Sequence, residues 1–365
     1  MYQYICTRCG KKVPVTTHAP CCECGGLFEL DFTPPAFSED LIDRSCWNIF
    51  RYRAFMPLLD DAYKSITLGE GMTPIVAYDE HLLIKMDYCM PTLSFKDRGA
   101  ATLIAHAKAI GVTSCVQDSS GNAGNSVAAY CARAGIDCDI YVPEATSPKK
   151  IDMIKAHGAR AHVIEGSRDH CADVCRAAVK EAGKYYANHV YNPYFYEGTK
   201  TYIYETFEQL HRLPETIFLP LGNGTLFIGA VKACEHLLQS GVIEKMPTLV
   251  AIQSEHCAPF AKAVELGLEH IAQVTPKATL AEGIAIGVPM RGDEILAMIR
   301  RYAIEVVEVK EDSILASRAA LARAGIYCEH TTAANYSAYL QYCQKHGQVN
   351  EALITMCGAG LKSDH

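Results

Sequence analysis

The segment Pro91–Ala100, PTLSFKDRGA, contains a lysine in a setting that can support covalent chemistry. Lys96 lies in a short loop just before a helical pattern, and a free lysine amine has a pKa of about 10.4. The amine becomes nucleophilic near neutral pH when burial or a cationic neighbour lowers that pKa, and Arg98 follows closely. Spacing alone leaves two interpretations open: Lys96 is a solvated surface lysine, or it forms a Schiff base.

Cysteines near the N-terminus have a spacing that is typical of a metal site. Cys6 and Cys9 form one C-x2-C pair, and Cys21 and Cys24 form a second pair after eleven intervening residues. Four thiolates can close a tetrahedral zinc site that leaves no open position for catalysis. We therefore predict a structural zinc site at these four cysteines. Cys22 could replace Cys21 but would give only C-x-C, and disulfides or free thiols are the alternative.

Two glycine-rich turns follow strand patterns and begin helices. Gly222 and Gly224 lie in PLGNGTL, where the missing side chains let backbone amides approach a phosphate and the next helix adds its positive end. The turn 119–124, SSGNAG, is a second helix start that can receive an anion. Ordinary strand-to-helix turns are the alternative for both. No Walker lysine follows the first turn, which disfavours a nucleoside triphosphate site.

These groups need a scaffold, and the hydrophobic pattern beyond residue 80 predicts one. Short apolar runs alternate with segments of helical spacing, several of which end in glycine. This alternation is typical of a parallel sheet covered by helices on both faces. The predicted strands are 113–118, 137–142, 160–165, 216–221, 248–253 and 352–356.

Composition excludes several classes of protein. The chain has 365 residues, of which 49% are apolar and 21% charged, so extensive disorder is excluded. The formal net charge of -7 disfavours a nucleic-acid binder that works through bulk electrostatics. No apolar run approaches the roughly 20 residues that cross a membrane, and the N-terminus lacks a secretory signal pattern. The 17 scattered cysteines indicate mostly reduced thiols, and we expect a cytoplasmic protein.

With the motif SFKDRG, the sequence resembles the threonine synthase family, in which this lysine binds pyridoxal phosphate; SFKxRGA also occurs in serine/threonine dehydratases. Both belong to the tryptophan-synthase-β-like, fold type II group of pyridoxal-phosphate enzymes. The resemblance extends over most of residues 45–365, in the order RYRAFMP, SITLGEGMTPIV, SSGNAGNSVAAYCARAG, YVPE, NPYFYEGTKT, PLGNGTL and GAGLK. Several independent motifs in one order make the expected fold specific.

The resemblance implies an α/β fold with two three-layer αβα domains built on parallel sheets, plus a small zinc-ribbon-like appendage at the N-terminus. The expected boundaries are 1–30 for the zinc-ribbon-like segment, 31–75 for a connecting arm, 76–96 and 196–365 for the large cofactor-binding domain, and 97–195 for the small α/β domain.

The resemblance also implies roles for individual residues. Lys96 would hold the cofactor and move the substrate's α-proton. Cys357 stands where the family places a Thr or Ser against the ring nitrogen, with a buried apolar cysteine as the alternative. Asn122 would bind the ring hydroxyl, and Ser119, Ser120 and the following amides, including that of Ala123, would hold the substrate carboxylate. The phosphate loop would comprise Gly222, Asn223, Gly224, Thr225 and Leu226.

The motif N-P-x-R-x-E-G of threonine synthases, which bears on the choice of substrate, is altered here. Phe195 stands where their arginine reaches the substrate phosphate, and phenylalanine cannot supply a cationic fork. Lys149, Lys150 or Lys200 could replace the lost cation, or each could be a solvated surface lysine. The stretches 278–287, ATLAEGIAIG, and 329–333, EHTTA, also depart from the family wording.

We therefore predict a pyridoxal-phosphate-dependent lyase that acts on a small amino acid, with threonine synthase as the best named activity. The first alternative is a serine/threonine dehydratase or a related β-elimination or replacement enzyme. The second is a non-catalytic zinc-ribbon protein on an enzyme scaffold, against which the intact Lys96, Asn122 and GNGT loop argue. We expect a homodimer, with no nucleic-acid or membrane partner.

Overall fold

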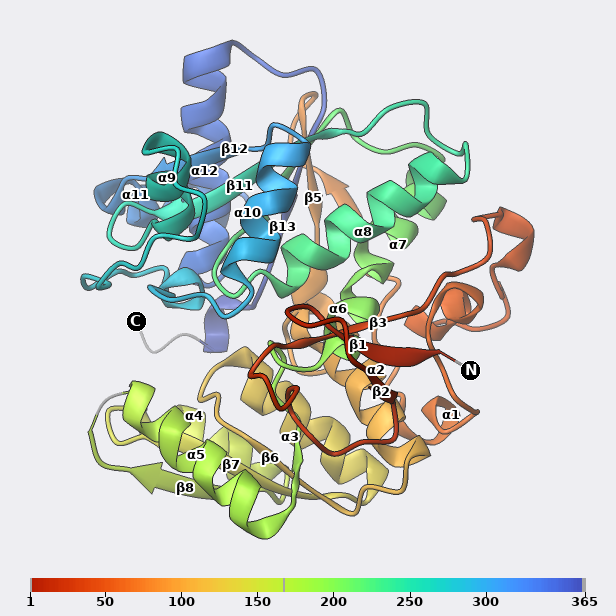
Figure 1. Cartoon of the computed structure of the whole chain (residues 1–365). Coiled ribbons are helices and arrows are strands. Elements are labelled where there is room, and N and C mark those ends of the chain that lie inside the picture. Colours follow the sequence, from red (N-terminus) through yellow and green to blue (C-terminus); the bar gives the residue numbers. More distant parts are fainter. Residues whose placement is uncertain (1, 167, 363–365) are drawn as a thin grey trace.

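The computed structural model describes residues 2–166 and 168–362. Two sheets dominate it, each with helices on both faces, and a small third sheet formed by the N-terminal strands lies across the junction between them (Figure 1). The predicted α/β class with parallel sheets is confirmed. None of the helices in this described part of the chain is both long and apolar enough to cross a membrane.

The large sheet has the strand order β12-β11-β10-β13-β5-β4, and only the β4–β5 pair is antiparallel. Ile217 and Leu219 of β10 face the core formed with helices α7, α8 and α10, whereas Phe218 faces the core formed with α11 and α12. Burial on both faces explains why the central strands are apolar throughout. The strands are β4 (Ile75–Ala77), β5 (Leu82–Lys85), β10 (Thr216–Pro220), β11 (Thr248–Ser254), β12 (Glu305–Val309) and β13 (Ala352–Thr355).

Predicted strands 216–221, 248–253 and 352–356 correspond to β10, β11 and β13. Strands β5 and β12 were not predicted, because β12 carries glutamates within its apolar run and β5 is short and ends in a lysine. The helices of this part are α6 (Pro193–Thr199), α7 (Thr201–Leu210), α8 (Thr225–Gln239), α9 (Pro259–Glu265), α10 (Gly292–Arg301), α11 (Glu311–Arg323) and α12 (His330–His346), with the 3-10 turns η3 (Asp87–Cys89), η4 (Glu282–Ile284) and η5 (Gly360–Lys362).

The small sheet is parallel throughout, in the order β8-β7-β6-β9. Cys115 of β6 faces the core shared with α2 and α3, and the next residue, Val116, packs with Cys175 and Val179 of α5 on the other face. Predicted strands 113–118, 137–142 and 160–165 correspond to β6, β7 and β8. The elements are α2 (Lys96–Ala109), β6 (Ser114–Gln117), α3 (Asn122–Ala134), β7 (Asp137–Pro143), α4 (Pro148–Ala156), β8 (Arg160–Ile164), α5 (Arg168–Ala182) and β9 (Tyr185–Tyr186).

The N-terminal strands β1 (Gln3–Cys6), β2 (Lys12–Pro14) and β3 (Phe28–Leu30) form an antiparallel sheet in the order β2-β1-β3. Arg291, at the start of α10, anchors this sheet from a buried position. Its guanidinium donates to the carbonyl of Phe28 at 2.7 Å and to that of Val190, which precedes α6, at 2.8 Å. The N-terminal sheet is thus tied to both larger parts of the molecule.

Residues 31–75 contain the short elements η1 (Glu39–Leu41), η2 (Ile49–Phe55) and α1 (Tyr63–Ile66). Phe50 of η2 belongs to the core next to the small sheet, whereas Tyr52 and Phe55 of the same turn belong to the core of the large sheet. This one segment therefore contributes side chains to the cores of both sheets.

Four fully buried charged side chains join α2 to the large sheet. Arg98 pairs with Asp87 at 2.8 Å and with Glu205 at 2.9 Å, and Lys85 pairs with the same Glu205 at 2.5 Å. Burial alone would raise the pKa of Glu205, but Arg98 and Lys85 hold it below its ordinary value. Removing one member would leave a buried charge without its partner, which is strongly unfavourable. The network therefore fixes α2 relative to β5 and α7.

A buried histidine joins α2 to the N-terminal sheet. The ring of His106 stacks on that of Tyr194 with centroids 3.7 Å apart, and its Nε2 lies 3.4 Å from the hydroxyl of Tyr4. Burial lowers the pKa of His106 to about 3. The folded protein therefore keeps this imidazole neutral at pH values where the unfolded chain, with a pKa near 6.5, binds a proton.

The resulting pH dependence has a definite sign. Because the folded pKa is depressed, the contribution of His106 to stability is complete above about pH 6.5 and is lost as the pH falls toward about 3. On acidification from about pH 7.5 to about pH 5.5, we expect wild type to lose on the order of 1 kcal/mol more unfolding free energy than His106→Gln. Urea unfolding of both proteins at the two pH values measures this; equal losses would contradict it.

Candidate active site

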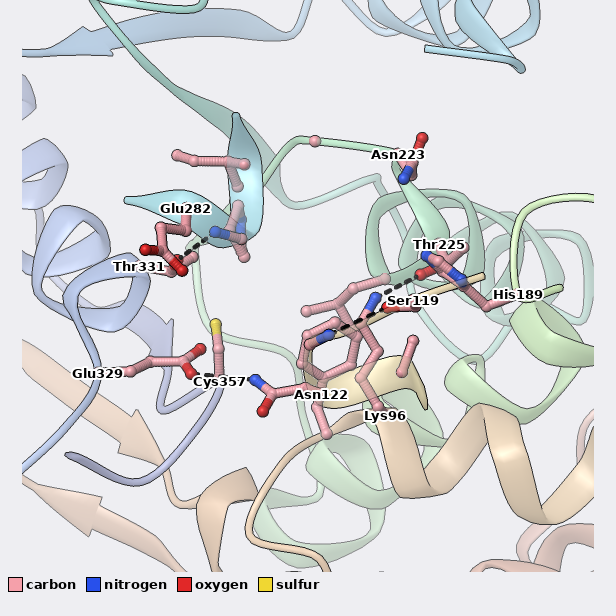
Figure 2. A pocket seen from close by; sticks show the side chains of 18 of the residues that line it. Lys96, Ser119, Asn122, His189, Asn223, Thr225, Glu282, Glu329, Thr331 and Cys357 are labelled. Carbon is pink, nitrogen blue, oxygen red and sulfur yellow. Dashed lines mark hydrogen bonds between the residues drawn. The ribbon is translucent and has the colours of Figure 1, made fainter. Parts of the chain in front are cut away.

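A cavity of about 220 Å³ opens between the two sheets. It is lined by loops that follow the carboxyl ends of strands and by the first turns of α2, α3, α8 and α12 (Figure 2). Parallel strands commonly place binding residues at this edge, because their carboxyl ends meet there. The predicted site residues that line the cavity are Lys96, Ser119, Ser120, Asn122, Ala123, Gly222, Asn223, Gly224, Thr225, Leu226 and Cys357.

Lys96 is the first residue of α2, and its amine donates to the hydroxyl of Thr225 at the start of α8, at 3.2 Å. Burial lowers the pKa of Lys96 to about 8, while the nearby Cys357 and Glu329 oppose that shift. A substantial fraction of this amine is therefore neutral near physiological pH, which a nucleophile or base requires. The structure corrects one part of the sequence interpretation: Arg98 is held by Asp87 and Glu205 and is not among the charges that shift Lys96.

The loop that carries Lys96 is attached to the end of β13. The backbone N–H of Phe95 donates to the carbonyl of Cys357 at 3.1 Å, and Ser94 forms a β-bridge with Gly358. Asp97, just inside α2, accepts from the backbone N–H of Thr92 at 2.7 Å and from its hydroxyl at 2.5 Å. Backbone and side-chain bonds on both sides of Lys96 thus define where its amine points.

The glycine loop between β10 and α8 forms the wall next to Lys96. Gly224 has a φ of +77°, a conformation that side chains disfavour, and a Cβ there would lie 2.3 Å from Ile295. A Cβ on Gly222 would lie 2.9 Å from the carbonyl oxygen of Gly283. The first N–H groups of α8 have no acceptors within the helix, and they carry its positive end. This wall can therefore receive a phosphate close to the lysine amine.

The opposite wall contains a carboxyl group that the sequence analysis did not assign. Glu329, the residue before α12, accepts a hydrogen bond from the side-chain amide of Asn122 at 3.0 Å, as Figure 2 shows. Burial raises the pKa of Glu329, and Asn122 and nearby lysines oppose that shift. Because Asn122 comes from α3 and Glu329 from beside the large sheet, their bond joins the two sides of the cavity. It also fixes which end of the Asn122 amide faces the carboxyl group.

Cys357 follows β13 and is almost completely buried. Its thiol donates to the carbonyl of Thr355 at 3.5 Å and accepts from the amide of Asn335 at 3.4 Å. Burial raises the pKa of the thiol well above its ordinary value, so Cys357 stays protonated. It presents a weak, neutral hydrogen-bonding group to the cavity.

Phe195 is the predicted substrate-binding residue that the structure does not bring to the cavity. It is fully buried in α6, within the apolar core that includes α2, and it is absent from the residues that line the cavity. A Cβ on Gly99 would lie only 2.3 Å from atoms of the Phe195 ring, so this glycine makes room for the ring. The centre of the ring lies 5.6 Å from the Lys96 amine. Because α6 packs this side chain into the core behind Lys96, a direct contact of Phe195 with the substrate stays a prediction.

Four N-terminal cysteines converge, and they differ from the predicted set at one position. The Sγ atoms of Cys6, Cys9, Cys22 and Cys24 all lie within 4.8 Å of one another. Cys21 is not among them and packs against the apolar cluster that contains Leu27 and Val116. The predicted ligand Cys21 is thus replaced by Cys22, since adjacent residues in this turn point in opposite directions. Gly26 makes room for the cluster, because a Cβ there would lie 2.6 Å from the Sγ of Cys6.

Several charged and polar residues of the cavity were not assigned by the sequence analysis. Glu329 and Glu282 belong to stretches that were noted only as departures from the family wording, so those departures were the available signal. Lys362 lies in the GAGLK motif, but nothing in that motif assigns it a position at the cavity. The unassigned lining residues include His189, Glu282, Glu329, His330, Thr331 and Lys362.

Solved structures share the overall fold of this chain. The chain superimposes on maize serine racemase with a TM-score of 0.71, covering 82% of this chain and 91% of that one at 20% identity. It superimposes on the processed form of threonine deaminase isoform 2 from Solanum lycopersicum with a TM-score of 0.71, covering 90% and 86% at 19% identity. At these identities the likeness shows the fold.

Relatives among curated sequences include threonine synthases. The one from Methanocaldococcus jannaschii is 28% identical, with 98% of this chain and 92% of that protein aligned. The one from Mycobacterium tuberculosis is 29% identical, with 86% and 88% aligned. Residues 66–358, which include Lys96, both glycine-rich turns and Cys357, match the family model described as pyridoxal-phosphate dependent enzyme. The chain therefore belongs to the family of pyridoxal-phosphate-dependent enzymes.

Proposed function

We propose that this protein is a threonine synthase, which converts O-phosphohomoserine and water to threonine and phosphate. The observation that carries the proposal is the placement of the Lys96 amine beside Thr225 at the glycine loop, in one cavity with the Ser119–Ala123 turn. The nearly full-length similarity to threonine synthases supports this choice among pyridoxal-phosphate enzymes. We extend the proposal to a cytoplasmic location, since none of the 17 cysteines forms a disulfide, which suits a reducing compartment.

The cavity fits pyridoxal phosphate in its charge and in its open space. The amine of Lys96 would take the aldehyde, and the loop from Gly222 to Leu226 would hold the phosphate at the positive end of α8. Asn122 would hold the ring hydroxyl, and the neutral thiol of Cys357 would face the ring nitrogen. A Cβ on either loop glycine would collide with a neighbouring residue, Gly283 for Gly222 and Ile295 for Gly224, which is a structural reason for glycine at both positions.

Bound pyridoxal phosphate supplies an electron sink for a carbanion at the substrate Cα. The chain's own residues would then position the substrate and move protons. The turn from Ser119 to Ala123, at the start of α3, would bind the substrate carboxylate. Lys96 would take the α-proton at Nζ, because burial lowers its pKa to about 8. The hydroxyl of Thr225, which accepts from Nζ, would keep the amine oriented.

One observation favours the dehydratase alternative. The described residues that line the cavity include no arginine, so the cationic fork that would grip a phosphorylated substrate is missing there. A dehydratase acting on serine or threonine would need no such group. The non-catalytic alternative is disfavoured because the lysine, the loop and Asn122 all line one cavity.

Product analysis separates these activities. With O-phosphohomoserine, we expect equal amounts of threonine and inorganic phosphate and no ammonia, because the proposed reaction eliminates phosphate from Cγ, adds water at Cβ and leaves the amino group on the product. Coupled phosphate and ammonia assays on the purified holoenzyme measure both products. Ammonia from serine or threonine, without phosphate release from O-phosphohomoserine, would replace the proposal by the dehydratase. An absence of both products from a protein that binds the cofactor would favour the non-catalytic alternative.

Lys96→Ala should abolish covalent attachment of the cofactor. In wild type, we expect a visible absorption band from the attached cofactor, which borohydride reduction fixes on the protein. The rate of cofactor attachment should rise with pH, with a midpoint near the Lys96 pKa of about 8. Lys149→Ala is the matched control, because Lys149 donates to the carbonyl of Leu361 outside the cavity. Mass spectrometry after reduction identifies the modified residue. Cofactor trapped on another lysine in Lys96→Ala would disprove the assignment.

We further propose that the N-terminal cysteine cluster holds one structural zinc ion. The four convergent Sγ atoms support this, since they can provide a complete tetrahedral thiolate set without an open position. The cluster is far from the catalytic lysine in the chain, and its expected role is to stabilise the N-terminal sheet.

The neighbouring cysteines at positions 21 and 22 provide a matched test of this site. We expect about one zinc per chain in wild type and in Cys21→Ser, and a large loss of zinc in Cys22→Ser, because only Cys22 lies among the four converging thiols. Elemental analysis of freshly purified protein measures the metal, and thermal unfolding measures its effect on stability. Retention of full zinc by Cys22→Ser together with loss in Cys21→Ser would restore the original assignment. A wild type without metal would exclude the site.

A further inference from the structure

Lys149, Lys150 and Lys200, the three lysines that could replace the missing cation, occupy different environments. Lys200 is buried, pairs with Glu197 at 2.5 Å and donates to the carbonyl of Phe55 at 3.3 Å. Lys149 donates to the carbonyl of Leu361 at 2.7 Å and does not line the cavity. Lys150 does line the cavity, so it is the one of the three that can reach a bound substrate.

Lys150 spans the cavity from the small-sheet side to the large-sheet side. It lies in the first turn of α4, and its amine pairs at 2.9 Å with Glu282 of η4, which also lines the cavity. The side chains of the pair are 24% and 63% exposed. Because the Glu282 carboxylate is mostly exposed, water screens its attraction to Lys150, and the pair contributes little to stability. Lys150 can therefore exchange Glu282 for a ligand anion at small cost.

The other charged groups of the cavity are less suited to this role. Lys362 is buried and donates to the carbonyl of Thr92 at 2.6 Å, which holds its amine against the backbone. Under the proposed function, the Lys96 amine binds the cofactor and does not bind the far end of the substrate. Glu329 is bonded to Asn122. Lys150 and Glu282 thus remain as an accessible pair of opposite charge on the cavity wall.

We propose that Lys150 binds the anionic group at the far end of the substrate, which is a phosphate if the substrate is O-phosphohomoserine, and that Glu282 holds Lys150 in the empty enzyme and competes with that anion. This inference rests on the proposed function, and it assigns to Lys150 the task that Phe195 cannot perform. The two partners have opposite effects on binding: Lys150 contributes to affinity for the anion, and Glu282 reduces it.

The test uses the holoenzyme variants Lys150→Met and Glu282→Gln, with Lys149→Met as the matched control on the same helical turn. For Lys150→Met, we expect the KM for O-phosphohomoserine to rise about tenfold or more, with a smaller change in kcat, because a charge-assisted bond is lost. For Glu282→Gln, we expect a lower KM, because the competing carboxylate is gone. Lys149→Met should match wild type. Unchanged thermal unfolding and cofactor absorbance verify that each variant folds and is loaded.

Calorimetric titration of the holoenzymes with inorganic phosphate provides a readout that does not depend on turnover. Weaker binding in Lys150→Met and tighter binding in Glu282→Gln support the proposal. Weaker binding in both variants would overturn it, since that is the result expected if the ion pair only holds the two sides of the cavity together. Wild-type turnover of O-phosphohomoserine with no effect of Lys150→Met would overturn this inference alone. Ammonia release from serine with no phosphate release would overturn the proposed function as well.

Discussion

The buried pairing of Arg98 and Lys85 with Asp87 and Glu205 is the constraint on which the rest of the structure depends. These four charges have no exposed surface, so each needs its partner in place to offset the loss of water. They belong to α2, β5, η3 and α7, and an arrangement that pairs all of them fixes α2 against the large sheet. Because Lys96 lies two residues before Arg98, the same pairing sets the position of the lysine.

From that fixed point, the cavity is assembled from elements distant in sequence. Thr225 comes from α8, Asn122 from α3, Glu329 from before α12, and Cys357 from after β13. Each lies at a strand-to-helix turn, a helix start or a strand end, where backbone groups are free to bind a ligand and side chains converge. The hydrogen bond from Asn122 to Glu329 and the ion pair between Lys150 and Glu282 both cross this space. Under the proposed function, substrate binding would be coupled to the relative position of the two sheets through the same side chains.

The N-terminal sheet reinforces this arrangement from outside the cavity. His106 links it to α2 and α6, and Arg291 links Phe28 to the segment before α6. The cysteine cluster lies at one end of β1, where a bound metal would hold two turns of the chain together. We infer that the N-terminal segment, which is too small for a substantial core of its own, stabilises the contact between the two larger parts.

The sequence by itself determined the features that depend on local order along the chain. The alternation of apolar strands and helices predicted the parallel sheets, and the motifs around Lys96, Asn122 and the glycine loop predicted residues that line one cavity. The roles of Lys96 and Asn122 came from the resemblance to a known family. The glycine loop could be predicted locally, because a glycine turn before a helix presents its amides in the same way wherever it occurs. The tertiary structure decided which side chain of a local pair points inward: Cys22 rather than Cys21, Lys150 rather than Lys149, and Phe195 into the core. It also brought Glu329 and Glu282 to the cavity and paired Arg98 away from Lys96. Those outcomes depend on packing between elements far apart in sequence, and a pattern read along one segment carries no information about the partner that it meets.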